Sequence, residues 1–518
     1  MASGRSTTAA RVRCCTASRC STSPLPDRAR GRRRGSSTAP RRHRPRGHRR
    51  PANVDAVTTS RSRLARLCAA GTVVFSLAAC GPPADPPRST STTVAPPRVT
   101  VTPSPVTPAP EFVPVAQLVE DAVAAGRLPG AVVTVGHDGA VVFRGAFGAR
   151  KLAGEPGLDG RPAPAEPMTE DTLFDLASLT KPLTTATGIL QLYERGHVGL
   201  DEPVQTYLPD FNPTGDPRRA KVTVRMLLTH TSGIAGDLSL DGPWGLVRAD
   251  KEEGIRRALG AWVVAEPGER FHYSDIGFII LGALLEKITG EPEDVYIERN
   301  VFAPLGMSDT YYLPVAKACG PHRIRGNAIV PDPGGPDPDE CADGTWSTEL
   351  LARVAPTALD EDTPGINPNY GHPLRGTVHD PTARRMGGVA GSAGVFSTAH
   401  DLGLYAQALL DRLAGRPSRF PLTRETTTLM TTVQQPGSGR GLGWDIDTAH
   451  SGPRGRIFPV GSFGHTGFTG TTLWIDPGSD TYVVVLANVI HVRGGPPITT
   501  LSGAVATASA RALHLYGN

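Results

Sequence analysis

The first apolar pattern that can support a folded domain begins at residue 115. Five apolar side chains recur there at intervals of one, three or four residues, namely Val115, Leu118, Val119, Ala122 and Val123. This spacing predicts an amphipathic helix over residues 115–125. Two β-rich runs follow at 131–136 and 140–147, and the Asp138-Gly139 pair between them favours a tight hairpin. The domain is therefore expected to open with a helix and two antiparallel strands.

Helical patterns then dominate residues 174–400. Two of them cover residues 179–195, followed by Gly196, and residues 276–288, followed shortly by Gly290. Glycine just beyond the last periodic residue is a frequent helix stop, which supports both boundaries.

β-Rich runs return near the C-terminal end and are followed by a last helical pattern. The runs cover residues 441–446, 463–467, 470–475 and 482–489, and the helical pattern covers 498–515. Strands at both ends of a helical middle predict an α+β fold. We expect an antiparallel sheet formed from both termini and flanked by helices, joined to a mostly helical subdomain, with the functional site where the two parts meet.

The positive charge of this 518-residue chain is concentrated at its start. The first 66 residues hold 18 Arg against only Asp27 and Asp55, so with a net charge of +5 for the whole chain the remainder carries about −11. Such arginine runs can bind nucleic acid electrostatically. We predict no nucleic-acid partner, because the pattern that follows is that of a secretion signal.

Arg61, Arg63 and Arg66 precede the apolar run 67–79 and then Cys80. This arrangement is typical of a signal peptide, and the run is too short for an ordinary transmembrane helix of ~20 residues. The segment Leu77-Ala78-Ala79-Cys80-Gly81 resembles the lipobox of bacterial lipoproteins, whose cysteine is lipidated and becomes the new N-terminus. A plain signal peptide cleaved nearby is the alternative.

These features divide the chain into four parts. Residues 1–60 are expected to be a basic, disordered leader or the product of a misassigned start codon, and 61–80 a lipoprotein signal peptide. Residues 81–114 are expected to be a Pro/Thr-rich linker, and 115–518 the folded domain. The predicted location is the outer face of the bacterial cytoplasmic membrane, held there by a lipid on Cys80.

After Cys80 only Cys319 and Cys341 remain, on either side of the Pro/Gly/Asp-rich segment 331–340. In an oxidising compartment they can pair in a disulfide, and two free thiols are the alternative. Neither cysteine has ligand-rich neighbours, and the chain contains no His-Glu-x-x-His. With no P-loop or Rossmann fingerprint either, we expect no metal and no cofactor.

Ser178 and Lys181 stand three residues apart near the start of the predicted helix 179–195, so their side chains share one face. A lysine can take the proton of a neighbouring serine if desolvation lowers its pKa, which makes the pair a candidate nucleophile and base. The N–H of Ser178 at a helix start can form half of an oxyanion hole. A solvated lysine at an ordinary helix start is the alternative.

Two downstream segments carry further candidate chemistry. Tyr273, in the run Phe271-His272-Tyr273-Ser274-Asp275, can relay a proton beside a lysine ammonium, or can simply be an aromatic core residue. Residues 464–470 precede the apolar run 472–475, and an edge strand there can hydrogen-bond an extended substrate, with Gly467 allowing close approach. A polar strand with a satisfied histidine is the alternative.

The order Ser-x-x-Lys, Tyr-x-Asn and Lys/His-Thr-Gly resembles the penicillin-recognising serine hydrolases, which comprise class C β-lactamases, DD-carboxypeptidases, D-aminopeptidases and related esterases. It occurs here as Ser178/Lys181, Tyr273/Asp275 and His465-Thr466-Gly467. Residues 227–233, 304–307 and 391–398 are similar to the class C branch, and the resemblance spans about residues 115–515. It implies a β-lactamase/transpeptidase-like fold.

The resemblance also implies a role for each matching residue. Ser178 would form an acyl-enzyme while Lys181 and Tyr273 share the proton transfers. The backbone N–H groups of Ser178 and Phe468 would hold the oxyanion. The substrate-binding residues would be Asp275, His465, Thr466 and Gly467. Val378-His379-Asp380 resembles a segment of one subgroup and is expected to be either a site-ordering loop or a solvated one.

Two departures from the family pattern bear on specificity. Asp275 stands where asparagine is usual, and His465 replaces a lysine. Both changes weaken recognition of a free carboxylate, so efficient β-lactam hydrolysis is not expected. The predicted function is an exported, monomeric serine hydrolase that cleaves an ester or an amide, either a carboxylic ester or a peptidoglycan-derived D-amino-acid peptide. The alternatives are a β-lactamase and, in another class, a non-catalytic binder of penicillin or peptidoglycan.

Overall fold

The computed structural model describes residues 109–492 and 497–517. The predicted leader, the signal peptide with Cys80 and the linker up to residue 108 lie outside the described residues. Within the described ranges, no helix combines the length and the apolar character needed to cross a membrane.

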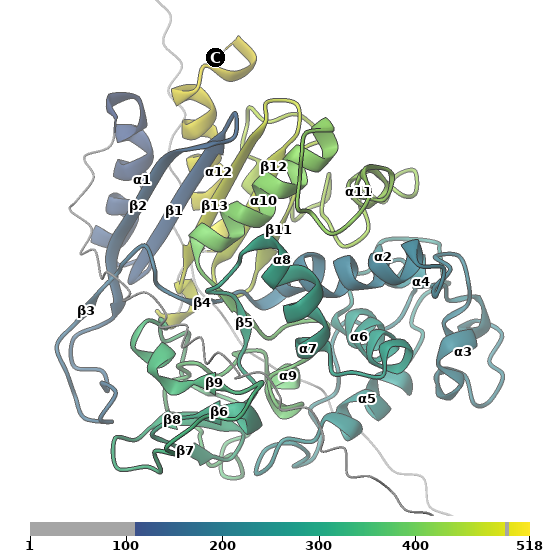
Figure 1. Cartoon of the computed structure of the whole chain (residues 1–518). Coiled ribbons are helices and arrows are strands. Elements are labelled where there is room, and N and C mark those ends of the chain that lie inside the picture. The colour runs from purple at the N-terminus through teal and green to yellow at the C-terminus, as the bar shows by residue number, and fades with distance from the viewer. Residues whose placement is uncertain (1–108, 493–496, 518) are drawn as a thin grey trace, which may run out of the picture. The chain divides into compact units, whose positions relative to one another are not determined.

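A six-stranded sheet unites the two ends of the domain (Figure 1). Its order is β11-β12-β13-β1-β2-β3, and every neighbouring pair is antiparallel. The strands are β1 (Gly130–His137), β2 (Ala140–Lys151), β3 (Glu166–Pro167), β11 (Phe463–Gly467), β12 (Thr471–Asp476) and β13 (Thr481–Ala487). Asp138 and Gly139 both have positive φ in the β1–β2 hairpin, as a two-residue turn of this kind requires. The predicted α+β fold with a sheet formed from both termini is confirmed.

Helices cover both faces of this sheet. The helices α1 (Val113–Ala124) and α12 (Ile498–Ala512) pack on one face, and α10 (Ala399–Ala414) crosses the other (Figure 1). Strand side chains alternate between the two cores: Val133 and Val485 join the cluster of α1 and α12, whereas Val132 and Val484 join the larger cluster. Burying such side chains contributes ~1.5–3 kcal/mol each, which explains why the two termini stay together.

A helical region packs beside the sheet, as the sequence predicts. Its helices are α2 (Thr187–Glu194), α3 (Val204–Tyr207), α4 (Val224–Leu228), α5 (Lys251–Leu259), α6 (Asp275–Thr289), α7 (Glu293–Ile297), α8 (Ala303–Leu305), α9 (Pro381–Arg385) and α11 (Arg424–Thr431). The longest of them, α6, is capped by the Ser274 hydroxyl, which accepts from the N–H of Gly277, and ends at Gly290 in the left-handed conformation. The predicted end of this helix is therefore correct.

The helical region also contains short strands, which the sequence analysis did not predict. A three-stranded sheet has the order β4-β10-β5, and two ribbons pair β6 with β9 and β7 with β8. Their bounds are β4 (Phe174–Asp175), β5 (Tyr311–Tyr312), β6 (Ala318–Cys319), β7 (His322–Arg325), β8 (Ala328–Pro331), β9 (Trp346–Ser347) and β10 (Val395–Ser397). Cys319 and Cys341 form a disulfide, so of the two alternatives the structure has the bonded pair.

The predicted strand over residues 441–446 is wrong. This segment is a tight loop in which the N–H groups of Leu442 and Gly443 donate to Met430 and Leu228 rather than to a neighbouring strand. Gly443 has a φ of 89°, and a Cβ there would lie 2.8 Å from that of Ala186. Only Asp445 pairs with the sheet, through Gly464 of β11. The apolar side chains that suggested a strand instead pack this loop against the helical region.

A buried carboxyl at the start of α7 yields a stability prediction. Glu293 is 1% exposed, accepts a 2.7 Å hydrogen bond from the Thr185 hydroxyl, and burial raises its pKa from 4.5 to about 7. The pKa of Glu293 is higher in the folded state than in the unfolded state. The folded protein therefore loses stability as the pH rises from the unfolded-state pKa to the folded-state pKa, and the loss is complete above both. Glu293→Gln keeps the acceptor without the charge. We expect it to stabilise the protein by ~3 kcal/mol at pH 8 and by under ~1 kcal/mol at pH 5.

Urea unfolding at the two pH values measures this difference. Glu349→Gln, at an exposed carboxylate, is the matched control and should change neither value. A Glu293→Gln variant that is equally stable or less stable than the wild type at pH 8 would contradict the prediction.

Candidate active site

Ser178 lies where strand β4 turns into a helix. A 3-10 turn spans Ala177–Leu179, one π-helical turn spans Lys181–Ala186, and α2 follows, so the helix predicted from residue 179 starts with two irregular turns. Ala177, directly before the serine, has a φ of 46°. A non-glycine residue in this region costs ~1–3 kcal/mol and persists only when its surroundings impose it.

The buried Asp175 carboxylate imposes this conformation. Its Oδ1 accepts from the N–H of Ala177 at 2.9 Å, and its Oδ2 accepts from the N–H of His379 at 2.7 Å. Burial raises the pKa of Asp175 to about 6. The strand, the nucleophile turn and the His379 loop are thus fixed to one side chain, which orients Ser178.

Lys181 is fully buried and surrounded by three acceptors. Its Nζ donates to Ser178 Oγ at 2.9 Å and to the Ser392 carbonyl at 2.8 Å, and lies 2.5 Å from Asp275 Oδ1. Burial acts to lower the pKa of Lys181, but the charge of Asp275, supported by Tyr273, outweighs it and raises the pKa above its usual value. The condition set for this lysine to act as a base, that desolvation lowers its pKa, is not met, because a carboxylate stands where the family pattern has a neutral amide.

Asp275 was predicted to bind substrate, but its carboxylate is directed at Lys181. It is the first residue of α6, where helix N-terminal N–H groups favour a negative charge. Its side chain is 22% exposed, so it lies at the edge of the site rather than free within it.

Tyr273 completes the group around the nucleophile. Its hydroxyl interacts with both Ser178 and Lys181, and its ring centroid lies 5.2 Å from Lys181 Nζ. Burial raises the pKa of the phenol, while the Lys181 charge acts in the opposite direction. The ring stacks on His230 with centroids 4.2 Å apart.

His230 is a positioning residue that the sequence did not single out. Its Nδ1 accepts from the N–H of Ser274 at 3.1 Å, and burial keeps its pKa well below the usual value, so the ring is neutral. The ring is therefore held by the same turn that carries Tyr273. The only sequence signal was its place inside the family-like stretch 227–233.

Strand β11 forms the edge of the sheet beside Ser178, and its last residues belong to the site. His465 is buried, its Nδ1 lies 2.8 Å from the Thr466 carbonyl, and burial keeps its pKa well below the usual value. The expectation that this histidine is mostly neutral at pH 7 is confirmed. A Cβ on Gly467 would overlap the Leu176 carbonyl and Thr471 Oγ1, so only glycine allows this contact with the nucleophile segment.

The turn after β11 is tied to the nucleophile segment. Thr469 Oγ1 donates to the Asp175 carbonyl at 2.6 Å, and Thr471 Oγ1 donates to the Leu176 carbonyl at 3.0 Å. These bonds fix Phe468 relative to Ser178. The two residues predicted to supply the oxyanion hole therefore lie on segments that are hydrogen-bonded to one another.

A cavity of about 190 Å³ opens at Ser178. The residues that line it are Ser178, Tyr273, Arg440, Asp445, His450, His465, Thr466 and Phe468. Arg440 was not predicted as a site residue. It is 1% exposed and lies 3.8 Å from Asp445, and its Nε has no hydrogen-bond partner. Burial lowers its pKa. The cavity thus brings together most of the predicted residues.

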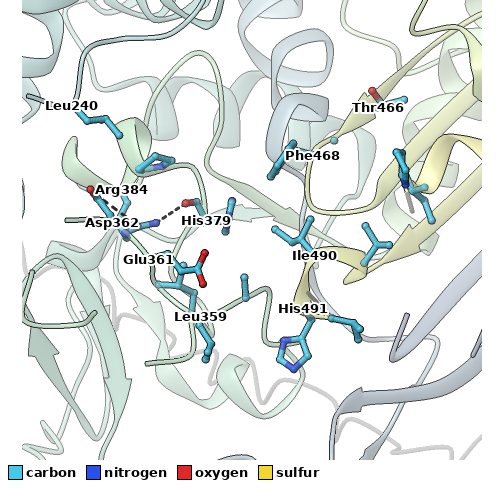
Figure 2. A pocket seen from close by; sticks show the side chains of 18 of the residues that line it. Leu240, Leu359, Glu361, Asp362, His379, Arg384, Thr466, Phe468, Ile490 and His491 are labelled. Carbon is cyan, nitrogen blue, oxygen red and sulfur yellow. Dashed lines mark hydrogen bonds and ion pairs between the residues drawn. The ribbon is translucent and has the colours of Figure 1, made fainter. Parts of the chain in front are cut away.

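A larger cavity of about 810 Å³ adjoins the first, because Thr466 and Phe468 line both (Figure 2). His379 lines it and stacks on Phe468 at 5.8 Å. Burial lowers the pKa of His379 to about 4, so this ring is neutral. Asp380 caps α9 by accepting from the N–H of Ala383 at 2.7 Å. Of the two alternatives for residues 378–380, the structure has a loop that orders the site.

The described residues contain no cluster of three or more His, Cys, Asp or Glu side chains arranged to hold a metal ion. The site presents a hydroxyl, an ammonium and a phenol in contact with one another.

A serine hydroxyl in contact with a buried lysine and a tyrosine, beside the edge strand of an antiparallel sheet, defines a serine hydrolase of the β-lactamase/transpeptidase fold. The chain belongs to the β-lactamase family, whose family model, described as "Beta-lactamase", matches residues 115–496. This confirms the resemblance inferred from the sequence.

Relatives and solved structures agree with this assignment. The chain is 30% identical over 387 residues to an N-acetylmuramyl-L-alanine amidase of Bacillus subtilis, covering 72% of this chain and 80% of that protein. It is 30% identical over 363 residues to a putative D-alanyl-D-alanine carboxypeptidase of Escherichia coli, covering 68% and 77%. A penicillin-binding protein homologue from Caulobacter crescentus has the same fold, with a TM-score of 0.56 at 19% identity over 78% of this chain and 98% of that one.

Proposed function

We propose that the protein hydrolyses an amide bond in a peptidoglycan-derived peptide through an acyl-Ser178 intermediate. The contact of Ser178 Oγ with the buried Lys181 ammonium, beside an edge strand, is the observation that carries the proposal. The choice of an amide is supported by the names of two relatives, one an N-acetylmuramyl-L-alanine amidase and the other a putative D-alanyl-D-alanine carboxypeptidase.

The geometry supports a two-step reaction. An extended substrate pairs with the edge strand β11, which places its carbonyl carbon against Ser178 Oγ. Ser178 attacks, and the oxyanion accepts hydrogen bonds from the N–H groups of Ser178 and Phe468. The serine proton passes through Lys181 and Tyr273 to the leaving amine, and water then hydrolyses the acyl-enzyme by the reverse path.

The two cavities support a substrate larger than a β-lactam. The small cavity has room for the scissile bond and the residue beyond it, and the 810 Å³ cavity can take the rest of a muramyl peptide. Neutral His465 offers no fixed positive charge to a penicillin carboxylate. For these reasons the β-lactamase alternative ranks second.

Export and lipid attachment at Cys80 form part of the same proposal, because a peptidoglycan substrate lies outside the cytoplasmic membrane. The lipobox-like segment supports it. Metabolic palmitate labelling of the wild type and of Cys80→Ala in the native host tests it, and equal labelling of the two would contradict it.

Parallel turnover assays test the proposed substrate. We expect the purified protein to release L-alanyl or D-alanyl products from muramyl peptides or wall pentapeptides with kcat/KM at least ~100-fold above that for nitrocefin, a difference of ~3 kcal/mol. Faster nitrocefin turnover would instead support a β-lactamase. Covalent labelling by fluorescent penicillin without turnover of any substrate would support the non-catalytic binder.

A further inference from the structure

The destination of the serine proton is constrained by the contacts of Lys181. An ammonium has three protons and no lone pair, and each proton here has an acceptor: Ser178 Oγ, the Ser392 carbonyl and Asp275 Oδ1. Lys181 can take the serine proton only if it gives up one of its own. A backbone carbonyl cannot hold a proton, and the Tyr273 phenol, which also contacts Lys181, already carries its own because burial raises its pKa. Of these contacts, the Asp275 carboxylate is therefore the one that can receive the proton.

Asp275 is placed to act in this way. Its Oδ1 has no hydrogen-bond donor besides the ammonium, although it is buried. Its own N–H donates to the Gly236 carbonyl at 2.9 Å, which brings the next residue, Asp237, beside it. The Asp237 carboxyl is hydrogen-bonded to that of Asp275 and is itself exposed to solvent. The two carboxyls therefore connect Lys181 to the surface.

We propose that Asp275 is the positioning residue that accepts a proton from Lys181 when Ser178 attacks, and that Asp237 shares this proton at the solvent side. The proposal rests on the hydrolytic function proposed above and goes beyond it by assigning the proton's destination.

The transfers balance at each step. As the Oγ–carbon bond forms, the hydroxyl proton moves to Lys181 Nζ, and one ammonium proton moves to Asp275, which becomes a neutral acid. When the bond to the leaving nitrogen breaks, Lys181 passes a proton through the Tyr273 hydroxyl to that nitrogen and recovers one from Asp275. The pair then returns to ammonium and carboxylate, so no net charge is left in the site.

Several charged or titratable groups face this pair. Tyr273 and Lys181 face Asp275 from the nucleophile side, Asp380 acts on it from the loop before α9, and His272 lies near Asp237. Burial raises the pKa of Asp237, and the charge of Asp275 adds to this effect. Because the Asp237 carboxyl is hydrogen-bonded to that of Asp275, the acid limb of the pH profile is expected to respond to a change at either residue.

Substitution of Asp275 and substitution of Asp237 are expected to shift the pH profile in opposite directions. Asp275→Asn removes the charge that keeps Lys181 protonated, so burial then lowers the pKa of Lys181 and the amine itself becomes the base. We expect the acid limb of kcat/KM to move to higher pH, with a loss of at least ~10-fold at pH 6 that narrows toward pH 9. Asp237→Asn removes a like charge beside Asp275, so the acid limb of this variant should move to lower pH.

The experiment measures kcat/KM of the full-length protein for a p-nitrophenyl ester between pH 4.5 and 9.5, read at the isosbestic wavelength of the phenol. Asp241→Asn, an exposed carboxylate on the same loop, is the matched control and should leave the profile unchanged. Thermal unfolding of each variant shows whether it is folded at each pH.

Shifts of the acid limb in opposite directions support the relay. An unchanged profile in folded Asp275→Asn, or shifts in the same direction for both variants, would overturn it. A wild-type protein that hydrolyses neither esters nor peptides would instead refute the proposed function, so the two failures are distinguishable.

Discussion

Ser178→Ala abolishes hydrolysis of both p-nitrophenyl esters and wall peptides, with an expected loss of at least ~10⁴ in kcat/KM. The oxygen removed is the hydroxyl that is proposed to form the acyl-enzyme, and it accepts a 2.9 Å hydrogen bond from Lys181 Nζ. Fluorophosphonate labelling, read by mass spectrometry of the modified peptide, should disappear together with turnover.

The variant should remain folded. Lys181 keeps its contacts with the Ser392 carbonyl and Asp275, so no buried charge is left without a partner. The melting temperature is therefore expected to stay within a few degrees of the wild-type value. Ser308→Ala, at an exposed serine, is the matched control for labelling. Residual turnover within tenfold of the wild type in folded Ser178→Ala would rule out the assignment of the nucleophile.

Lys181→Ala has the second-largest expected effect, a loss of at least ~10³ in kcat/KM at every pH, because the proton transfer and the orientation of Ser178 both depend on Nζ. It should also destabilise the protein. The Asp275 carboxylate loses the ammonium with which it is paired, and breaking a buried pair by removing one partner costs ~3 kcal/mol or more. Urea unfolding and steady-state kinetics on the same preparations measure the two effects.

A double variant separates these contributions. Lys181→Ala/Asp275→Asn carries no unpaired charge, so it should regain much of the lost stability without regaining activity. Activity that returned along with stability would show that Lys181 is structural only. By contrast, Asp275→Asn alone should retain activity at alkaline pH, since it keeps the amine.

Much of the fold was predictable because periodic apolar patterns set its long elements. The helix α6, the β1–β2 hairpin and the C-terminal strands all follow from local spacing and from glycines at their ends. The strands of two residues, such as β4 and β6, were not predictable, since pairs this short are formed by tertiary contacts and leave no period to detect. The same reason explains the error at residues 441–446, whose apolar side chains fit a buried loop as well as a strand.

In the site, the identities of Ser178, Lys181 and Tyr273 followed from motif order, whereas their electrostatics did not. Asp275 was visible in the sequence as a departure from the family pattern, but whether it faced substrate or Lys181 depended on the orientation of α6. That orientation reversed the expected direction of the Lys181 pKa. Arg440 reaches the cavity, and His230 stacks on Tyr273, through folding over long distances in the chain. No local pattern indicates Arg440, and the signal for His230 was its place in the family-like stretch 227–233.

β1 pairs with β13, so the six-stranded sheet forms only when the last strand of the domain reaches its first strand. Ser178 is made early by the ribosome, but the strand and turn that complete its surroundings come from residues 463–471, nearly three hundred positions later. A nascent chain stopped before this point would carry the nucleophile without the N–H of Phe468, the second of the two proposed oxyanion donors. Activity is therefore expected only after residues 463–471 have been made, and any product that ends before them should be inert.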